Sequence, residues 1–350
     1  MSYDLLRFQQ TCFEMIWGGT RLCTGSPAEE KKIGEAWLIA DHPACCSVVA
    51  EGPHAGRTLH DLLLEDSPAL LGTRPTPTIH GQFPLLLKLL DAAQPLSVQV
   101  HPDDEAAARL GEPDVGKTEM WHVLESTPGA ELICGLDPTV TPEIFAQAVQ
   151  DGGIERFMRR IPSPAETSVF VPAGTIHAIG AGIFLAEIQQ NSNITYRIYD
   201  WGRIDTQGRA RELHVDKALQ VLQFGEESPG ASQPLALAEE GATRHILAAC
   251  HYFAAERVQL HGPRYTRLIN GATFHILLGL EGHMTVRTAT TPMELSPRIA
   301  LLVPGSSQAC VIEGEGVFLE YYVPHLESDL RVPLRAAGHA EDTIQCLIHS

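Results

Sequence analysis

The sequence predicts a mainly β fold in which one β unit is repeated, with a few peripheral helices, mostly in the N-terminal half. Twelve short apolar runs, rich in β-branched residues, are separated by Gly, Pro, Asp or Asn, a pattern typical of strands and tight turns. The repeat is indicated by Val171–His177 (VPAGTIH) and Val303–Ala309 (VPGSSQA), each of which lies between two apolar runs. In this alignment Ala309 takes the place of His177, so a ligand held by His177 has no counterpart in the second copy.

The individual elements follow in chain order. We expect strands at EAWLIAD, CCSVVAEG, LSVQVHP, AELICGLD, SVFVPAG, IFLAEIQQ, ITYRIYD, FHILLGLEG, MTVRTAT, IALLVPG, ACVIEG and VFLEYYVP. Helical periodicity and capping residues predict helices within 58–66, 103–112, 141–161 and 214–224. The stretch 226–242 is rich in Pro, Gly, Ser and Glu and is interpreted as a linker. We therefore expect a first domain at 1–235, a second β domain at 236–325, and a C-terminal tail at 326–350.

Composition excludes several classes of protein. The 350 residues include 25 Lys and Arg against 43 Asp and Glu, a net charge of −18, which disfavours binding to nucleic acid and to anionic membranes. Residues 167–186 carry no charge, but Pro172, Gly174 and His177 fit buried strands and turns better than a membrane helix. Eight scattered Cys without CxxC pairs, and the absence of a secretory signal pattern, predict reduced thiols and a cytoplasmic location.

Polar side chains recur at alternating positions of predicted strands. In LSVQVHP, the residues Ser97, Gln99 and His101 share one face of the strand. In GKTEMWHVL, Lys117 and Glu119 share a face beside apolar neighbours. A solvated edge strand and an exposed Lys–Glu pair remain alternative interpretations of these two segments.

A third polar element lies in the uncharged segment. The His177 ring there needs a metal or a hydrogen-bond partner. Together with Gln99, His101 and Glu119 it offers nitrogen and oxygen donors without thiolate, a set that suits Zn²⁺, Fe²⁺, Mn²⁺ or Co²⁺ in an open, catalytic site. Glu187 and Arg197 lie on later strands and could face the same interior. A surface ion pair remains the alternative for Arg197.

These residues lie in segments that resemble the type I mannose-6-phosphate isomerases, a family of zinc-dependent cupins. The resemblance covers residues 5 to about 205 and rests on IWGG (16–19), IGEAWLIAD (33–41), PLLLKLLDAAQPLSVQVHPDD (84–104), GKTEMWHVL (116–124), VPAGTIHAIGAG (171–182) and AEIQQNSNITYRIYDWGR (186–203). The gap of 58 residues between Glu119 and His177 resembles the compact bacterial form of the family. The family resemblance implies two cupin (jelly-roll) β-barrel units, of which the second binds no metal.

The resemblance also implies a role for each candidate residue. Matched position by position, one Zn²⁺ per chain would be held by Gln99, His101, Glu119 and His177. The catalytic residues would be Arg197, Glu187 and Lys117, and the sugar phosphate would contact Lys88, Ser97 and Lys117. The segment 191–194 departs slightly from the commoner serine-and-aspartate version, which affects substrate detail and not the metal.

The implied reaction interconverts mannose 6-phosphate and fructose 6-phosphate through a cis-enediol, with Glu187 as the first candidate for the base and Lys117 as the second. A non-catalytic sugar-phosphate-binding cupin and an iron-dependent cupin oxygenase are the alternatives. The expected partner is a small sugar phosphate, with no nucleic acid and no membrane. The sequence leaves the oligomeric state open.

Overall fold

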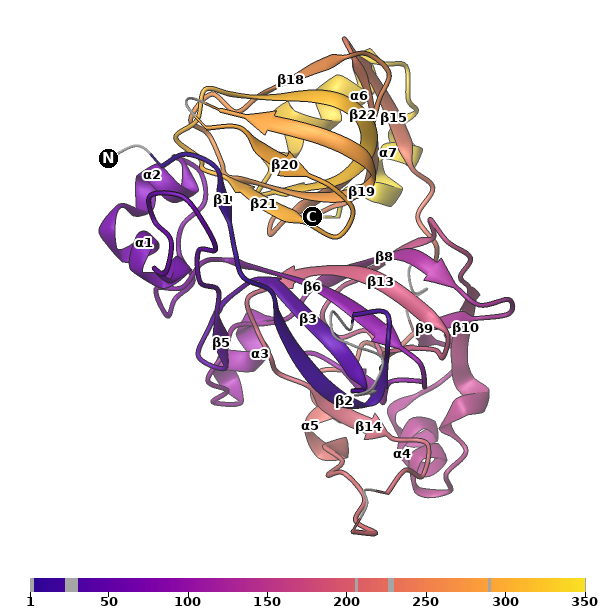
Figure 1. Cartoon of the computed structure of the whole chain (residues 1–350). Helices are drawn as coiled ribbons and strands as arrows, with labels where there is room; N and C mark the ends of the chain where they lie inside the picture. Colours follow the sequence, from indigo (N-terminus) through magenta and orange to yellow (C-terminus); the bar gives the residue numbers. More distant parts are fainter. Residues whose placement is uncertain (1–2, 23–30, 205–206, 226–229, 289–290, 350) are drawn as a thin grey trace. The chain divides into compact units, whose positions relative to one another are not determined.

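The computed structural model describes residues 3–22, 31–204, 207–225, 230–288 and 291–349 (Figure 1). Two compact units account for the chain. Unit 1 comprises Met1–Thr11, Trp37–Leu87 and Ser232–Ser350, and unit 2 comprises Cys12–Ala36 and Lys88–Ala231. These units interleave along the chain, whereas the domains expected from sequence were consecutive. Ser232 lies close to the expected boundary at 235, and the functional division at 235 and 325 stays a prediction.

Unit 1 contains a nine-stranded antiparallel sheet in the order β1-β21-β19-β22-β17-β16-β15, with β18 paired to β22 and β20 to β19. Its strands are β1 (Leu6–Arg7), β15 (Leu235–Glu239), β16 (Ala242–Ala249), β17 (Ala254–Leu260), β18 (Arg264–Leu268), β19 (His275–Arg287), β20 (Met293–Leu295), β21 (Ala300–Val303) and β22 (Ala309–Tyr322). A short pair is formed by β4 (Asp41–His42) and β5 (Cys45–Cys46), and the helices are α1 (Leu59–Glu65), α2 (Ser67–Leu71), η2 (Leu326–Arg331), α6 (Val332–Ala336) and α7 (Glu341–Leu347).

Unit 2 is built on a five-stranded sheet, in the order β10-β9-β12-β7-β14, and on most of a six-stranded sheet, in the order β11-β8-β13-β6-β2-β3. The strands are β2 (Thr11–Gly19), β3 (Ile33–Ile39), β6 (Leu85–Ala92), β7 (Val98–Val100), β8 (Glu119–Ser126), β9 (Glu131–Leu136), β10 (Met158–Pro162), β11 (Ser168–Val171), β12 (His177–Ile179), β13 (Ile183–Gln190) and β14 (Tyr196–Tyr199). The helical elements are α3 (Asp104–Arg109), α4 (Pro142–Gln150), η1 (Ile154–Phe157) and α5 (Val215–Leu219).

The mainly β, antiparallel fold confirms the predicted fold class. Several element predictions need correction. The expected helix at 141–161 ends at Gln150, and its last residues form β10. Part of the expected linker is β15, which pairs with β16, while residues 226–229 lie outside the described part of the chain. Most of FHILLGLEG and the start of MTVRTAT lie in one strand, β19, because β19 and β22 stay paired across Gly282 and Gly314. For the same reason ACVIEG and most of VFLEYYVP lie in one strand, β22.

The expected C-terminal tail is folded. Leu330, Leu334 and Ile344 are fully buried and pack in one apolar cluster with residues of β15 and β16, such as Leu235 and Ile246. The alternation of buried and exposed residues in this segment is too short to stand out as a helical period. Among the described residues, no helix is long and apolar enough to span a membrane.

One face of the five-stranded sheet packs against helices, and the other face carries Gln99. Val98 and Val100 pack into an apolar cluster that includes Phe145 of α4 and Ala218 of α5. Trp121 of β8 belongs to a second cluster, to which no helix of the described residues contributes. Because side chains alternate along a strand, the residue between the two valines, Gln99, faces away from the helices.

The two units share a strand register around the Val-Pro turn that the sequence repeats. In unit 2, Val171 of β11 pairs with Glu119 of β8, and in unit 1, Val303 of β21 pairs with His275 of β19. Glu119 and His275 therefore occupy equivalent positions. The predicted repeat is thus visible in strand pairing as well as in sequence.

One strand further, the same register relates two glutamates. Glu187 of β13 pairs with Trp121, and Glu320 of β22 pairs with Leu277. Trp121 and Leu277 both lie two residues beyond the Glu119 and His275 positions on their strands. Glu187 and Glu320 are therefore equivalent, and both are buried.

In unit 1, a buried ionic cluster surrounds Glu320, the residue equivalent to Glu187 of unit 2. Glu320 Oε1 is 2.6 Å from His275 Nδ1 and accepts a hydrogen bond from Arg267 Nε at 3.0 Å. Glu256 accepts two hydrogen bonds from the Arg244 guanidinium, at 2.6 and 2.7 Å. Side-chain cations thus neutralise the carboxylates inside unit 1.

Candidate metal centre and active site

The ends of three strands bring His101, Glu119 and His177 together. His101 directly follows β7, whereas Glu119 and His177 are the first residues of β8 and β12. The turn before His177 contains Gly174 at φ +84°, and a Cβ there would lie 2.9 Å from the Val221 carbonyl oxygen. Glycine is therefore required at this turn, which sets the direction from which His177 enters the site.

The three side chains converge on one point. His177 Nε2 lies 3.1 Å from His101 Nε2 and 3.4 Å from Glu119 Oε1, and His101 Nε2 lies 3.5 Å from Glu119 Oε2. All three side chains are buried, with exposed fractions of 1% or less. This set meets the distance requirement for three ligands of one metal ion.

The protonation pattern of the site fits a metal ion. His177 Nδ1 lies 2.8 Å from the Thr175 carbonyl oxygen, so Nδ1 carries the proton and Nε2 presents a lone pair toward His101. Neither Glu119 oxygen accepts a hydrogen bond of normal geometry from a described residue, although Lys117 Nζ forms an ion pair at 2.7 Å. Two imidazole nitrogens and a carboxylate are donors that zinc and other divalent transition metals accept.

Burial keeps the histidines neutral. It lowers the pKa of His177 to about 3, and burial together with the Lys117 charge lowers the pKa of His101 well below its ordinary value. For Lys117, burial opposes the charged form, but the adjacent Glu119 outweighs it and the pKa is raised. The site therefore presents neutral imidazoles, as metal ligation requires, beside a charged ammonium group.

Gln99 is placed beside His177 by the sheet register. The two residues are directly paired across β7 and β12, so their side chains share a face. On its other side Gln99 pairs with Arg197 of β14. Arg197 Nε donates to Ser97 Oγ at 3.3 Å, and Nη1 donates to the Glu212 carbonyl oxygen at 2.9 Å. One row of the sheet thus carries His177, Gln99 and Arg197.

A second group of charges involves Glu187. Its Oε2 accepts a hydrogen bond from Trp121 Nε1 at 2.9 Å, and its Oε1 lies 3.7 Å from Lys88 Nζ. Lys88 Nζ is also 3.4 Å from Glu35 Oε2. Burial, followed by the nearby Glu119, raises the pKa of Glu187. The two predicted lysines are therefore ion-paired and buried, with Lys88 in this group and Lys117 beside the triad.

Comparison with known proteins identifies the family. The family model for the phosphomannose isomerase type I catalytic domain matches residues 5–119. A mannose-6-phosphate isomerase of Streptococcus mutans is 34% identical over 312 residues, which cover 89% of this chain and 95% of that protein. The chain belongs to the type I mannose-6-phosphate isomerase family. A probable mannose-6-phosphate isomerase of Bacillus subtilis is 43% identical over a shorter match, 60% of this chain and 65% of that relative.

A solved structure of the family supports the fold. The crystal structure of the mannose 6-phosphate isomerase from Bacillus subtilis matches with a TM-score of 0.82 at 29% identity, covering 91% of this chain and 99% of that one. The match extends well beyond residue 205, where the sequence resemblance ended. Both units therefore follow the isomerase family fold.

Four polar residues of this family member were missed by sequence reasoning. Glu35 contacts Lys88, Trp121 donates to Glu187, and Asp200 accepts from Arg211 through both carboxylate oxygens. Trp121 was recognised only as an apolar neighbour of Glu119. The alternating pattern of β8 places Trp121 on the Glu119 face and could have indicated it, whereas no pattern links Asp200 to a loop residue.

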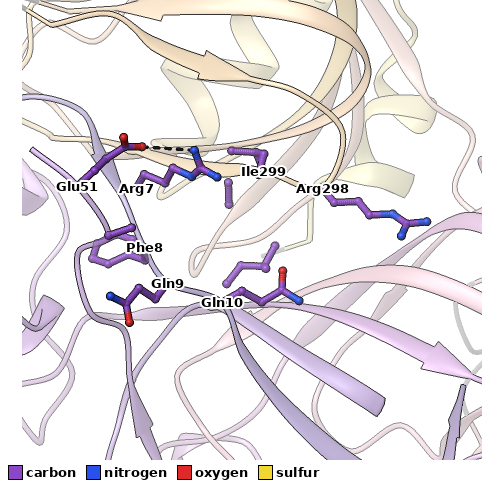
Figure 2. Close-up of a pocket in the computed structure, with 10 residues that line it drawn as sticks. Arg7, Phe8, Gln9, Gln10, Glu51, Arg298 and Ile299 are labelled. Atoms are coloured by element: carbon purple, nitrogen blue, oxygen red, sulfur yellow. Dashed lines mark hydrogen bonds and ion pairs between the residues drawn. The ribbon is translucent and has the colours of Figure 1, made fainter. Parts of the chain in front are cut away.

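A pocket in unit 1 has a different composition. Its volume is about 340 Å³, and Figure 2 shows it lined by polar and apolar side chains, with Arg7 paired to Glu51 at 3.3 Å. None of its lining residues belongs to the candidate metal centre of this isomerase family member. The pocket therefore adds no residue to the candidate active site.

Proposed function

We propose that the chain interconverts mannose 6-phosphate and fructose 6-phosphate, moving a proton between C2 and C1 through a cis-enediol. The observation that carries the proposal is the buried convergence of His101, Glu119 and His177, with the Glu187 carboxylate in the same interior. The Streptococcus mutans relative, which matches over nearly its whole length, is named for this isomerase activity. The substrate partner is accordingly a hexose 6-phosphate.

We assign a metal ion, Zn²⁺ by preference, to His101, Glu119 and His177, with Gln99 as the fourth ligand. Support for Gln99 comes from its place directly beside His177 on the same face of the sheet. A bound ion would supply Lewis acidity that stabilises the negative charge developing on the sugar during the reaction. The absence of thiolate from the converging set favours a catalytic ion over a structural one.

Glu187 is the residue we assign to move the proton. Its carboxylate is buried and its pKa is raised, which brings its basicity closer to what proton transfer near neutral pH requires. The Trp121 indole holds Oε2, and Lys88 lies near Oε1, so the carboxylate has a fixed orientation. Lys117 is the second candidate for the base, and its ion pair with Glu119 makes it the poorer acceptor.

Arg197 and Ser97 would act on the substrate beside the metal. The Arg197 guanidinium has no carboxylate partner among the described residues, so its charge remains available to an oxyanion. Ser97 accepts from Arg197 and can also donate to a sugar oxygen. Lys88 and Lys117 complete the polar surroundings of the reacting carbons.

A coupled assay of the purified chain on mannose 6-phosphate, mannose and other aldose phosphates tests the proposal. Isomerisation of mannose 6-phosphate above the others is expected. Tight binding without turnover would leave a sugar-phosphate-binding protein. Oxygen consumption by iron-loaded protein, without isomerisation, would replace the isomerase with an oxygenase.

A further inference from the structure

The two buried lysines are poorly placed for a phosphate. Lys117 pairs with Glu119, and Lys88 lies between Glu35 and Glu187, so these two ammonium groups face three carboxylates. Both lysines are at most 5% exposed. A phosphate dianion brought here would meet carboxylates at every lysine and would have to lose its hydration.

A second cationic group lies beyond Tyr199, the last residue of β14. Figure 1 labels this strand. Asp200 follows this strand and accepts two hydrogen bonds from Arg211, at 2.7 Å from Nε and 2.6 Å from Nη2. It also accepts from Arg203 Nε at 3.1 Å. Burial acts to raise the pKa of Asp200, but the two arginines outweigh it and the pKa is lowered. Asp200 is therefore an anion that holds two guanidinium groups in place.

The two arginines differ in the donors they have left. Arg203 uses Nε and Nη2 on Asp200 and donates from Nη1 to the Pro95 carbonyl oxygen at 2.6 Å. Arg211 uses only Nε and Nη2, and its Nη1 forms no hydrogen bond within the described ranges. The Arg211 side chain is 31% exposed, against 15% for Arg203. Arg211 thus has Nη1 available to donate to a ligand, whereas each nitrogen of the Arg203 guanidinium already donates to the protein.

This group lies on the same sheet as the candidate metal centre. Arg197 Nη1 donates to the carbonyl oxygen of Glu212, the residue that follows Arg211, at 2.9 Å. After burial, the Arg211 charge is the largest influence that lowers the pKa of Arg197. Arg197 is two strands from His177 through Gln99, which is about 10 Å at ordinary strand spacing. An open-chain six-carbon sugar phosphate has a comparable reach from its carbonyl end to its phosphate.

We propose that Arg211, oriented by Asp200 and anchored beside Arg203, binds the phosphate group of the substrate and sets the preference for phosphorylated sugars. The inference rests on the proposed isomerase function and deepens it. The substrate's phosphate would then bind at the end of β14, and not at Lys88 and Lys117 as the family resemblance implied. The guanidinium groups of Arg203 and Arg211 provide the positive charge there, against the carboxylates of Asp200 and Glu212.

Arg211→Gln in the full-length, zinc-loaded protein tests the proposal. A charge-assisted hydrogen bond is worth about a tenfold change or more in affinity. We expect KM for mannose 6-phosphate and the inhibition constant of inorganic phosphate to rise by about that factor. The value of kcat for mannose 6-phosphate should change little. Arg160→Gln, which removes an exposed arginine elsewhere in unit 2, is the matched control.

The outcomes separate this inference from the proposed function. Unchanged KM and unchanged phosphate inhibition in Arg211→Gln would overturn the phosphate site while leaving the isomerase intact. If the wild-type chain does not isomerise mannose 6-phosphate, calorimetry with inorganic phosphate still decides, because weaker binding by Arg211→Gln alone supports the site. Asp200→Asn provides a second variant, in which phosphate affinity should fall less than in Arg211→Gln.

Discussion

Arg197 carries a charge that no described carboxylate neutralises in direct contact. Its guanidinium donates to a hydroxyl and a backbone carbonyl instead, and burial lowers its pKa. A positive charge kept this way is suited to an oxyanion that forms only during reaction. We expect Arg197→Ala to lower kcat by roughly 10²- to 10³-fold, with a modest change in KM, measured by steady-state assay. A raised KM at unchanged kcat would instead assign Arg197 to ground-state binding.

Glu187 can be tested through the proton itself. Glu187→Gln keeps an acceptor for Trp121 Nε1 but removes the base, so we expect kcat to fall by about 10²- to 10⁴-fold. Exchange of the sugar C2 proton with solvent deuterium, followed by NMR, should fall in parallel. Trp121→Phe, which removes the donor and keeps the base, should retain most of the exchange. Undiminished exchange in Glu187→Gln would transfer the role of base to Lys117.

Sequence patterns anticipated the grouping of His101, Glu119 and His177. The prediction rested on alternating polar positions in two strands, on the uncharged segment around His177, and on the family resemblance. Their role as metal ligands stays a prediction. The pairing of Asp200 with Arg211 could not be anticipated, because it depends on how an irregular segment folds back. The burial of Lys88 between two carboxylates depends on contacts between separate strands, which one strand's pattern does not reveal.

Among the elements, α6 shows how the C-terminal segment is held. Leu334 is fully buried in the cluster with β15 and β16, whereas Val332 in the same helix is 51% exposed. Leu334→Ala should lower the free energy of unfolding by about 2–5 kcal/mol, measured by denaturant titration. Val332→Ala is the matched control and should change it by less than about 0.5 kcal/mol. Equal effects of the two substitutions would contradict the packing role of α6.

Element boundaries were predictable where chemistry is local. Thr141 caps α4 through the Ile144 amide, as the sequence indicated. The end of α4 was not predictable from local chemistry. Gly152 and Gly153 follow the helix, and β10, which pairs with β9, begins a few residues later. Likewise, Gly282 and Gly314 divide apolar runs in sequence, but they lie within β19 and β22. The strands stay paired through both glycines, although their φ angles are positive, at +75° and +119°.

For the whole molecule, removal of the metal provides a test with two readouts. Chelator-treated protein should lose isomerase activity and recover it with added Zn²⁺. A ligand that binds only the folded state also raises stability, so the melting temperature should rise on reloading. His177→Ala should abolish that rise. Full activity in demetallated protein would exclude the metal mechanism.

The ionic cluster of unit 1 predicts acid sensitivity. Burial acts to raise the pKa of Glu320, but Arg267 and His275 outweigh it and hold it well below its usual range. A carboxyl with a lowered folded-state pKa stabilises the fold above its unfolded pKa, about 4.3, and this contribution is lost as pH falls toward the folded-state value.

Denaturant titrations between about pH 7 and pH 3 check this expectation. Glu320→Gln should lose about 3 kcal/mol or more at pH 7 and show a weaker pH dependence than wild type. Glu294→Gln, which removes an exposed partner of His283, is the control and should follow wild type. A wild-type pH dependence in Glu320→Gln would contradict the assignment.

The shared register of Glu187 and Glu320 has a consequence for how each unit depends on its surroundings. In unit 1 the balancing cations are arginine side chains, so they are synthesised with the chain and cannot be removed by a chelator. The Arg244 guanidinium also occupies both oxygens of the Glu256 carboxylate. In unit 2 the proposed function instead has His101, Glu119 and His177 bind a metal ion, which the cell would have to supply. Under the proposed function, the same strand plan would pair its carboxylates with side-chain cations in unit 1 and with an exchangeable ion in unit 2.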